Sequence, residues 1–278
     1  MSVEKNIGLV ATDLDGTLLR NDKSISPDDL RMLELLGERN ILRVVATGRN
    51  LKKVREVIPD HVPFDYVAFS SGAGIYDCLK RELIYYQNIQ QGTVNRILEL
   101  LITKDLNFHL FRPVPNNFRC WYHRGKEFCH EFERYFGFHN SVSEALPNSG
   151  QVNSDACQFL VMFRDAAQFH DLKAELEHQC EDIKVLRASS PLDSGYVWME
   201  IFHRTVSKGN AIRFLCEHRQ ILPETTFGIG NDYNDLDLLD FTSFSYLTDN
   251  GPEELKARYR YAPSNEENAF SVSLKNHL

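Results

Sequence analysis

Two aspartates end a short apolar stretch near the start of the sequence, and together they have the chemistry to act on a phosphate group. Residues 7–12 are typical of a buried strand, and Asp13, Asp15 and Gly16 follow directly. Because ligands of an open parallel sheet bind where its strands end, we expect both carboxylates at that edge. Paired carboxylates repel a phosphate unless a cation is present. The pattern predicts a Mg²⁺ site with Asp13 as nucleophile, Asp15 as acid and base, and Gly16 allowing close backbone approach.

A calcium loop does not fit the same residues. An EF-hand loop that began at Asp13 would need glycine at its sixth position and glutamate at its twelfth. Here Gly16 is the fourth residue and Ser24 is the twelfth. A plain surface turn is less expected, because a fully apolar run leads into the acidic residues.

Two further sites are expected to support these carboxylates. Residues 41–46 form a second apolar run, which ends in Thr47, Gly48 and Arg49 before a helical stretch. A hydroxyl and backbone N–H groups at a helix start can hold a phosphate. Lys208 opens another helix after a strand at 197–202. A lysine in a first helical turn opposes the helix dipole, so we expect an anion beside it.

The sequence Asp13-Leu-Asp-Gly-Thr-Leu resembles the first motif of the haloacid dehalogenase superfamily. The stretch Thr47-Gly-Arg resembles the second motif in the Cof-type sugar-phosphatase branch, and Ser207-Lys-Gly resembles the third. The segment 228–235 is similar to the fourth motif, whose first aspartate binds Mg²⁺ in the family. The four motifs occur in the family's order, so the resemblance implies a magnesium-dependent phosphatase.

The sequence departs from the family pattern at two positions. Ser71 stands where the family usually has an asparagine near the substrate, and Asn231 stands at the first aspartate of the fourth motif. An amide oxygen can bind Mg²⁺ but adds no charge, and Asp232 is an alternative ligand that the sequence leaves open. The resemblance implies metal contacts from Asp13, Asp15, Asn231 or Asp232, and Asp235, and phosphate or substrate contacts from Gly16, Gly48, Arg49, Ser71 and Asn234.

The middle of the chain has a different pattern. Strand-like runs at 108–114, 120–123, 159–163 and 183–186 alternate with helical runs at 94–101, 127–136 and 166–179, and none ends in acidic residues followed by glycine. We therefore expect a doubly wound parallel α/β core from residues 1–86 and 195–278, with an inserted α+β domain from 87–194. By resemblance this insert is a class IIB cap that sets substrate specificity.

Composition limits the partners. The chain has 278 residues, a net charge of −8 and 42% hydrophobic residues, which does not suggest nucleic-acid or membrane-surface binding. Six cysteines without a C-x-x-C pair argue against a zinc site and a disulfide framework. No signal-peptide or membrane-span pattern is seen, so a cytoplasmic protein that binds a small phosphorylated molecule is expected. The sequence does not indicate an oligomeric state.

The expected function is hydrolysis of a small phosphorylated metabolite, most simply a sugar phosphate, through an aspartyl-phosphate. Two alternatives stay open. A phosphohexomutase would use the same aspartates but pass the phosphoryl group to a second hydroxyl. A binding protein with impaired catalysis would be consistent with Asn231.

Overall fold

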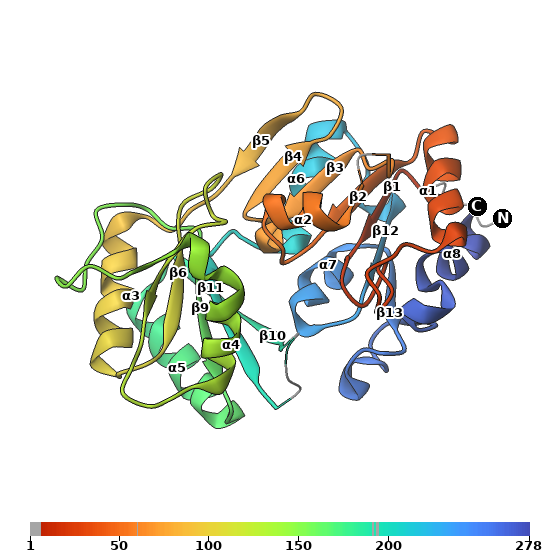
Figure 1. The fold of residues 1–278 in the computed structure, drawn as a ribbon. Helices are drawn as coiled ribbons and strands as arrows, with labels where there is room; N and C mark the ends of the chain where they lie inside the picture. Colours follow the sequence, from red (N-terminus) through yellow and green to blue (C-terminus); the bar gives the residue numbers. More distant parts are fainter. Residues whose placement is uncertain (1–6, 60, 191, 193–194) are drawn as a thin grey trace. The chain divides into compact units, whose positions relative to one another are not determined.

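The protein is described here by a computed structural model, which covers residues 7–278 except 60, 191 and 193–194. The chain divides into two compact units (Figure 1). The first unit contains residues 1–85 and 207–278, and the second is the continuous segment 86–206.

The first unit is built on an eight-stranded sheet with helices packed on it. Its strand order is β14-β13-β12-β1-β2-β3-β4-β5, and all strands from β14 to β3 pair in parallel with their neighbours. β4 turns back and pairs antiparallel with β3. The strands are β1 (Leu9–Thr12), β2 (Leu42–Ala46), β3 (Tyr66–Phe69), β4 (Gly74–Asp77), β5 (Glu82–Tyr86), β12 (Thr226–Gly230), β13 (Phe244–Thr248) and β14 (Arg260–Ala262).

The described residues of this unit also form the α-helices α1 (Pro27–Glu38), α2 (Leu51–Val57), α6 (Lys208–Arg219), α7 (Leu236–Phe241) and α8 (Ala269–Leu274). Ile212 and Leu215 of α6 and Leu238 of α7 pack on apolar residues of β1, β2 and β3. α1 packs against β2 and α8, and α2 packs against β3. Burial of these apolar strands under helices gives the α/β core that the sequence predicted.

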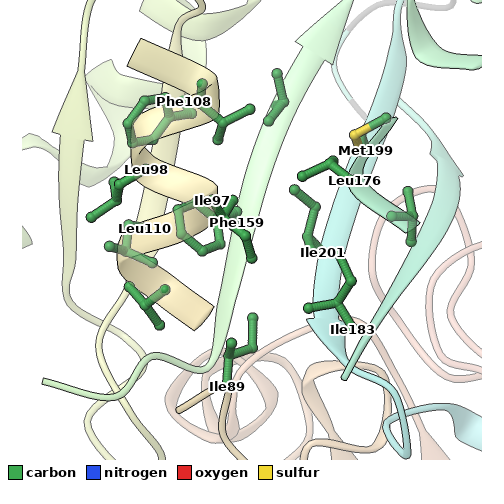
Figure 2. Packing of buried hydrophobic residues seen from close by; sticks show 14 of the residues in the cluster. Ile89, Ile97, Leu98, Phe108, Leu110, Phe159, Leu176, Ile183, Met199 and Ile201 are labelled. Atoms are coloured by element: carbon green, nitrogen blue, oxygen red, sulfur yellow. The ribbon is translucent and has the colours of Figure 1, made fainter. Parts of the chain in front are cut away.

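The second unit has a six-stranded sheet in the order β10-β11-β9-β6-β7-β8, antiparallel except for the parallel β7–β8 pair. Figure 2 shows its core, in which Ile97 and Leu98 of α3 and Leu176 of α5 meet Phe159 and Ile201 of the sheet. The elements are α3 (Gln91–Thr103), β6 (Phe108–Phe111), β7 (Cys120–His123), α4 (His130–His139), β8 (Ser143–Ala145), β9 (Gln158–Phe163), α5 (Ala166–Gln179), β10 (Ile183–Ser189) and β11 (Val197–His203).

The opposite face of this sheet carries α4. Phe108 belongs to the core under α3 and α5, and side chains alternate along a strand, so His109 points to the other face. There its ring stacks on Phe132 of α4, with ring centroids 4.5 Å apart. α4 therefore covers the sheet from the side that α3 and α5 leave open.

One predicted boundary is wrong. The sequence suggested that the core resumes at residue 195 with the strand at 197–202. β11 instead pairs with β9 and β10, and the second unit extends to Val206. The strand itself was predicted, but its apolar residues give no information about which sheet it joins. Among the helices that the structure describes, none is long and apolar enough to cross a membrane.

Candidate active site

The polar residues that follow β1, β2, β3 and β12 meet at one edge of the first sheet. β1 lies between β2 and β12, and the N–H of Asp13 donates to the carbonyl of Ile229 at 2.9 Å. The N–H of Thr47 donates to Ala68 at 2.9 Å, which fixes the end of β2 against β3. Parallel pairing thus places residues from both ends of the chain beside Asp13, as expected at the carboxyl edge of such a sheet.

Lys208 is the buried cation of this edge. Its Nζ lies 2.5 Å from Oδ1 of Asp13 and 2.6 Å from Oδ1 of Asp235, and it donates to Oδ1 of Asn234 at 3.3 Å. Lys208 and Asp235 are at most 1% exposed, and Asp13 is 5% exposed. The helix that carries Lys208 is capped by Ser207, whose hydroxyl accepts from the N–H of Asn210 at 3.1 Å. The anionic partner expected for this lysine is therefore a pair of carboxylates.

Burial and the neighbouring charges shift the pKa values of Asp13 and Lys208. Burial and the charge of Asp235 raise the pKa of Asp13, and they outweigh the lowering influence of Lys208. Burial disfavours the charged form of Lys208, but the two carboxylates dominate and raise its pKa above the ordinary value. Two carboxylates and one ammonium leave a net negative charge in a buried place, which favours binding of a further cation.

Asp235 organises the loop that follows β12. Its Oδ2 accepts from the N–H of Asn231 at 2.9 Å and of Asp232 at 3.0 Å. A Cβ at Gly230 would lie 2.5–2.7 Å from the Asp235 side chain, so only glycine allows this close approach. Since Asp235 Oδ1 is held by Lys208, this carboxylate is committed to hydrogen bonds with the protein. Its expected role as a metal ligand stays a prediction.

Three oxygen-bearing groups do converge beside Asp13. The terminal amide atom of Asn231 lies 3.2 Å from Oδ2 of Asp13, 2.9 Å from the carbonyl oxygen of Asp15 and 3.1 Å from Oγ1 of Thr17. With nitrogen at that position, the amide donates to all three. With oxygen there, the Asn231 oxygen lies 2.9–3.2 Å from the other three, close to the ~3 Å between neighbouring ligands of octahedral Mg²⁺. The donor set of Asp13, the Asp15 carbonyl and Asn231 therefore fits Mg²⁺.

These atoms belong to residues from which the sequence predicts metal ligands, and the full ligand set stays a prediction. Among the described residues, no group of three Asp, Glu, His or Cys side chains could hold a metal ion. Asp232 caps a short helical turn with Asp235, and the Asp15 side chain points to cations. A site at this edge would thus rest on one carboxylate, one backbone carbonyl and one amide.

The Asp15 carboxylate is held by two positively charged side chains. Nε of Arg49 lies 2.5 Å from Oδ2, Nη2 of Arg49 lies 2.7 Å from Oδ1, and Nζ of Lys23 lies 3.0 Å from Oδ1. Burial works against the charged form of Asp15, but the hydrogen bonds and charges of Arg49 and Lys23 outweigh it and lower the pKa of this carboxyl. The sequence did not point to Lys23, because an isolated lysine in a loop carries no motif signal.

The remaining candidate residues surround Gly48. A Cβ at Gly48 would lie 3.7 Å from Oγ of Ser71 and 3.8 Å from Nδ2 of Asn234, so these side chains approach the same backbone. Oγ1 of Thr47 accepts from the N–H of Arg49 at 3.2 Å. The N-cap of α2 is Asn50, so the Thr47 hydroxyl is not the cap of that helix.

The turn after β3 packs closely against the start of α6. Ser70, Ser71 and Gly72 all have positive φ, at 48°, 55° and 94°. A Cβ at Gly72 would come within 2.3 Å of the carbonyl oxygen of Ser207, which precedes Lys208. This contact couples the position of Ser71 to that of the buried lysine.

Known proteins share this architecture. A structure from Bacteroides thetaiotaomicron, described as a phosphatase of the haloalkanoate enzyme superfamily, superposes with a TM-score of 0.81 at 17% identity over 100% of this chain and 97% of that one. A subclass IIB sugar phosphatase gives a TM-score of 0.76 at 17% identity, with 96% and 98% coverage. A 5-amino-6-(5-phospho-D-ribitylamino)uracil phosphatase of Bacillus subtilis is 24% identical over 94% of this chain and 95% of its own.

The family assignment rests on a wider match. The sequence model of the haloacid dehalogenase-like hydrolases covers residues 10–273, which include all four motifs and the whole second unit. The resemblance seen in the motifs is thereby confirmed. The chain belongs to the family of haloacid dehalogenase-like hydrolases.

Proposed function

We propose that the protein is a Mg²⁺-dependent phosphatase that hydrolyses a small phosphorylated metabolite, such as a sugar phosphate, through an aspartyl-phosphate. The observation that carries the proposal is the position of Asp13, which lies at the carboxyl end of the central strand with Lys208 on Oδ1 and the Asn231 amide near Oδ2. The ammonium of Lys208 offsets the charge of this carboxylate, and an added cation would let a dianionic phosphate bind beside it. The phosphatase names of several relatives support the same reaction.

In the first step, a carboxylate oxygen of Asp13 attacks phosphorus while the bond from phosphorus to the leaving oxygen breaks. Asp15 gives its proton to that oxygen, so the leaving group departs as an alcohol. In the second step, Asp15 takes a proton from water while the water oxygen attacks phosphorus, and the bond from phosphorus to Asp13 breaks, which releases phosphate and restores the Asp13 carboxylate. Lys208 and Thr47 stabilise negative charge on the transferred group.

Asp13, the Asp15 carbonyl and Asn231 would hold Mg²⁺, which supplies positive charge against the phosphate oxygens. The structure has Asp15 in its ionised partnership with Arg49 and Lys23, the form that the second step requires. For the first step, Asp15 must turn from these cations towards the leaving oxygen and carry the proton that it took from water in the preceding turnover.

The test is phosphate release from p-nitrophenyl phosphate and a panel of sugar phosphates, with Mg²⁺ and with EDTA. We expect metal-dependent release by the wild type and none by Asp13→Asn, with the circular dichroism spectrum unchanged. Asp171→Asn, which alters an exposed aspartate of α5, is the matched control and should keep full activity. Near wild-type release by Asp13→Asn would overturn the proposal. Product analysis with sugar phosphates separates hydrolysis from transfer to a second hydroxyl.

A further inference from the structure

We propose that the leaving group of the natural substrate carries a second anionic group, a carboxylate or a phosphate, which binds Lys23 and Arg49. This inference rests on the proposed phosphatase function and narrows its substrate class. It starts from an imbalance of charge around Asp15, where one carboxylate meets two cations.

The cations converge on one carboxylate oxygen. Oδ1 of Asp15 accepts both from Nη2 of Arg49 at 2.7 Å and from Nζ of Lys23 at 3.0 Å. Arg49 alone already makes a two-point contact with Asp15, so Lys23 adds a positive charge beyond what pairing requires. The side chain of Lys23 is 52% exposed, so its ammonium is open to another partner.

The charges of Asp13 and Glu56 act on Arg49, but the acidic side chains nearest to Lys23 and Arg49 are hydrogen-bonded to other groups. Asp22 directs Oδ1 to the N–H and hydroxyl of Ser24, at 2.9 and 2.6 Å. Glu56, the next acid towards Arg49, binds Nζ of Lys53 at 2.7 Å. The surplus positive charge is therefore available to a ligand.

Lys23 is held in place by its loop. It adopts a φ of 68°, and its N–H donates to the carbonyl of Arg20 at 2.9 Å. The N–H of Arg20 donates to the carbonyl of Ser24 at 2.9 Å, and bridges join Leu19 to Ile25 and to Asp15. The turn fixes the Lys23 backbone, and from there its ammonium reaches Asp15.

The chemistry of Asp15 decides which part of a substrate meets these cations. An acid that protonates the leaving oxygen must be within hydrogen-bond distance of it. Groups that contact the same carboxylate then lie beside the first atoms of the leaving group. At the other end, Asp13 and Asp235 share Lys208, and the transferred phosphate would bind there together with the metal ion. Lys23 and Arg49 therefore lie on the side of the leaving group.

An anionic group on the substrate would also compete with Asp15 for Lys23. When it takes the place of the Asp15 carboxylate on Lys23, it weakens the hold on Asp15, which can then turn to the leaving oxygen. A neutral leaving group offers Lys23 no such exchange. Substrates with the second anion should therefore bind more tightly, and Lys23 should be a specificity-determining residue.

The experiment compares substrates that differ by one carboxylate. The pairs are 2-phosphoglycolate with 2-hydroxyethyl phosphate, and 6-phosphogluconate with glucitol 6-phosphate, and p-nitrophenyl phosphate reports general hydrolysis. We expect the wild type to favour the carboxylate member of at least one pair at least tenfold in kcat/KM. Lys23→Met should reduce that ratio at least fivefold, mainly through KM, and Lys23→Arg should keep most of it. Lys80→Met, which removes an exposed lysine of the β4–β5 turn, is the control and should leave the ratio unchanged.

Each outcome decides between the two proposals. Hydrolysis of p-nitrophenyl phosphate with a carboxylate ratio near one in both pairs, or a ratio that survives Lys23→Met, overturns the second anion and leaves the phosphatase. No metal-dependent hydrolysis of any compound overturns the phosphatase and, with it, this inference.

Discussion

The ammonium of Lys208 lies 2.5 Å from Oδ1 of Asp13, although 195 positions separate the two residues. The same ammonium contacts Asp235, so one lysine joins the segment after β1 to the segment after β12. The pair is almost completely buried. Electrostatic balance and the geometry of the site therefore depend on the same side chain.

Replacement of this lysine should cost stability as well as activity. Lys208→Met leaves Asp13 and Asp235 buried without their cation, and loss of one partner of a buried ion pair costs about 3–5 kcal/mol. We expect a lower free energy of unfolding in urea without metal, together with loss of phosphate release. The double variant Lys208→Met/Asp235→Asn removes one of the stranded charges. It should recover part of the stability and none of the activity; a single variant as stable as the wild type would contradict this account.

Restoring a carboxylate at Asn231 should tighten metal binding. Asn231→Asp adds a negative charge beside Asp13 Oδ2 and the Asp15 carbonyl, and hard divalent cations prefer charged oxygen ligands. We expect about tenfold tighter Mg²⁺ binding, which corresponds to ~1.4 kcal/mol. The readout is the Mg²⁺ dependence of the melting temperature, checked by activity. Asp232→Asn is the comparison: if it weakens Mg²⁺ binding and Asn231→Asp has no effect, Asp232 is the ligand instead.

Two glycine-to-alanine changes should have opposite signs. At Gly72 the backbone has a φ of 94° and a Cβ would approach the carbonyl of Ser207 at 2.3 Å. Gly72→Ala should lower stability by about 2 kcal/mol or more and reduce activity, because the start of α6 must shift. Gly137 lies inside α4 with open space around its Cα, so Gly137→Ala should raise stability by about 0.5–1 kcal/mol. Chemical denaturation measures both, and an unharmed Gly72→Ala would refute the close contact.

The second unit should lose stability in acid through His109. Burial, with the charges of His139 and Arg124, lowers the pKa of His109 from 6.5 to about 3. The unfolded chain therefore binds a proton that the folded unit does not. The contribution of neutral His109 is complete above pH 6.5 and is lost as pH falls towards 3, by up to ~1.4 kcal/mol per pH unit.

His109→Phe tests this origin. Phenylalanine preserves the ring that stacks on Phe132 but cannot take up a proton. Melting curves between pH 7 and pH 4 should fall less steeply for His109→Phe than for the wild type. His178→Gln, at an exposed position of α5, should follow the wild type. Parallel curves for the wild type and His109→Phe would assign the acid sensitivity to other groups.

The sequence predicted the strands that carry the site because their signals are local. An apolar run that ends in Asp13, and another that ends in Thr47, each contain both the strand and its chemistry. Once a parallel sheet is assumed, the edge at which these residues meet follows without further information. In the structure Lys208, Asn231 and Asn234 lie at that edge with them, while their chemical roles remain predictions.

The features that could not be predicted from the sequence depend on contacts between distant segments. β11 has the composition of any buried strand, and only its pairing with β9 and β10 assigns it to the second unit. The sequence predicts Asp235 as a metal ligand but gives no sign of the two backbone N–H groups and of Lys208, which it contacts in the structure. The contact of Lys23 with Asp15 can be recognised only in the structure, where Lys23 has a positive φ and lies beside this carboxylate.

The position of β1 between β2 and β12 has a consequence for synthesis on the ribosome. Asp13 emerges early in translation, but β12 and Lys208, which lie beside it in the folded chain, come after residue 206. The second unit is one continuous segment, so its sheet can close while the first sheet still lacks β12, β13 and β14. An incomplete nascent chain thus carries Asp13 without Lys208, and the site is complete only when the last quarter of the polypeptide has joined the sheet.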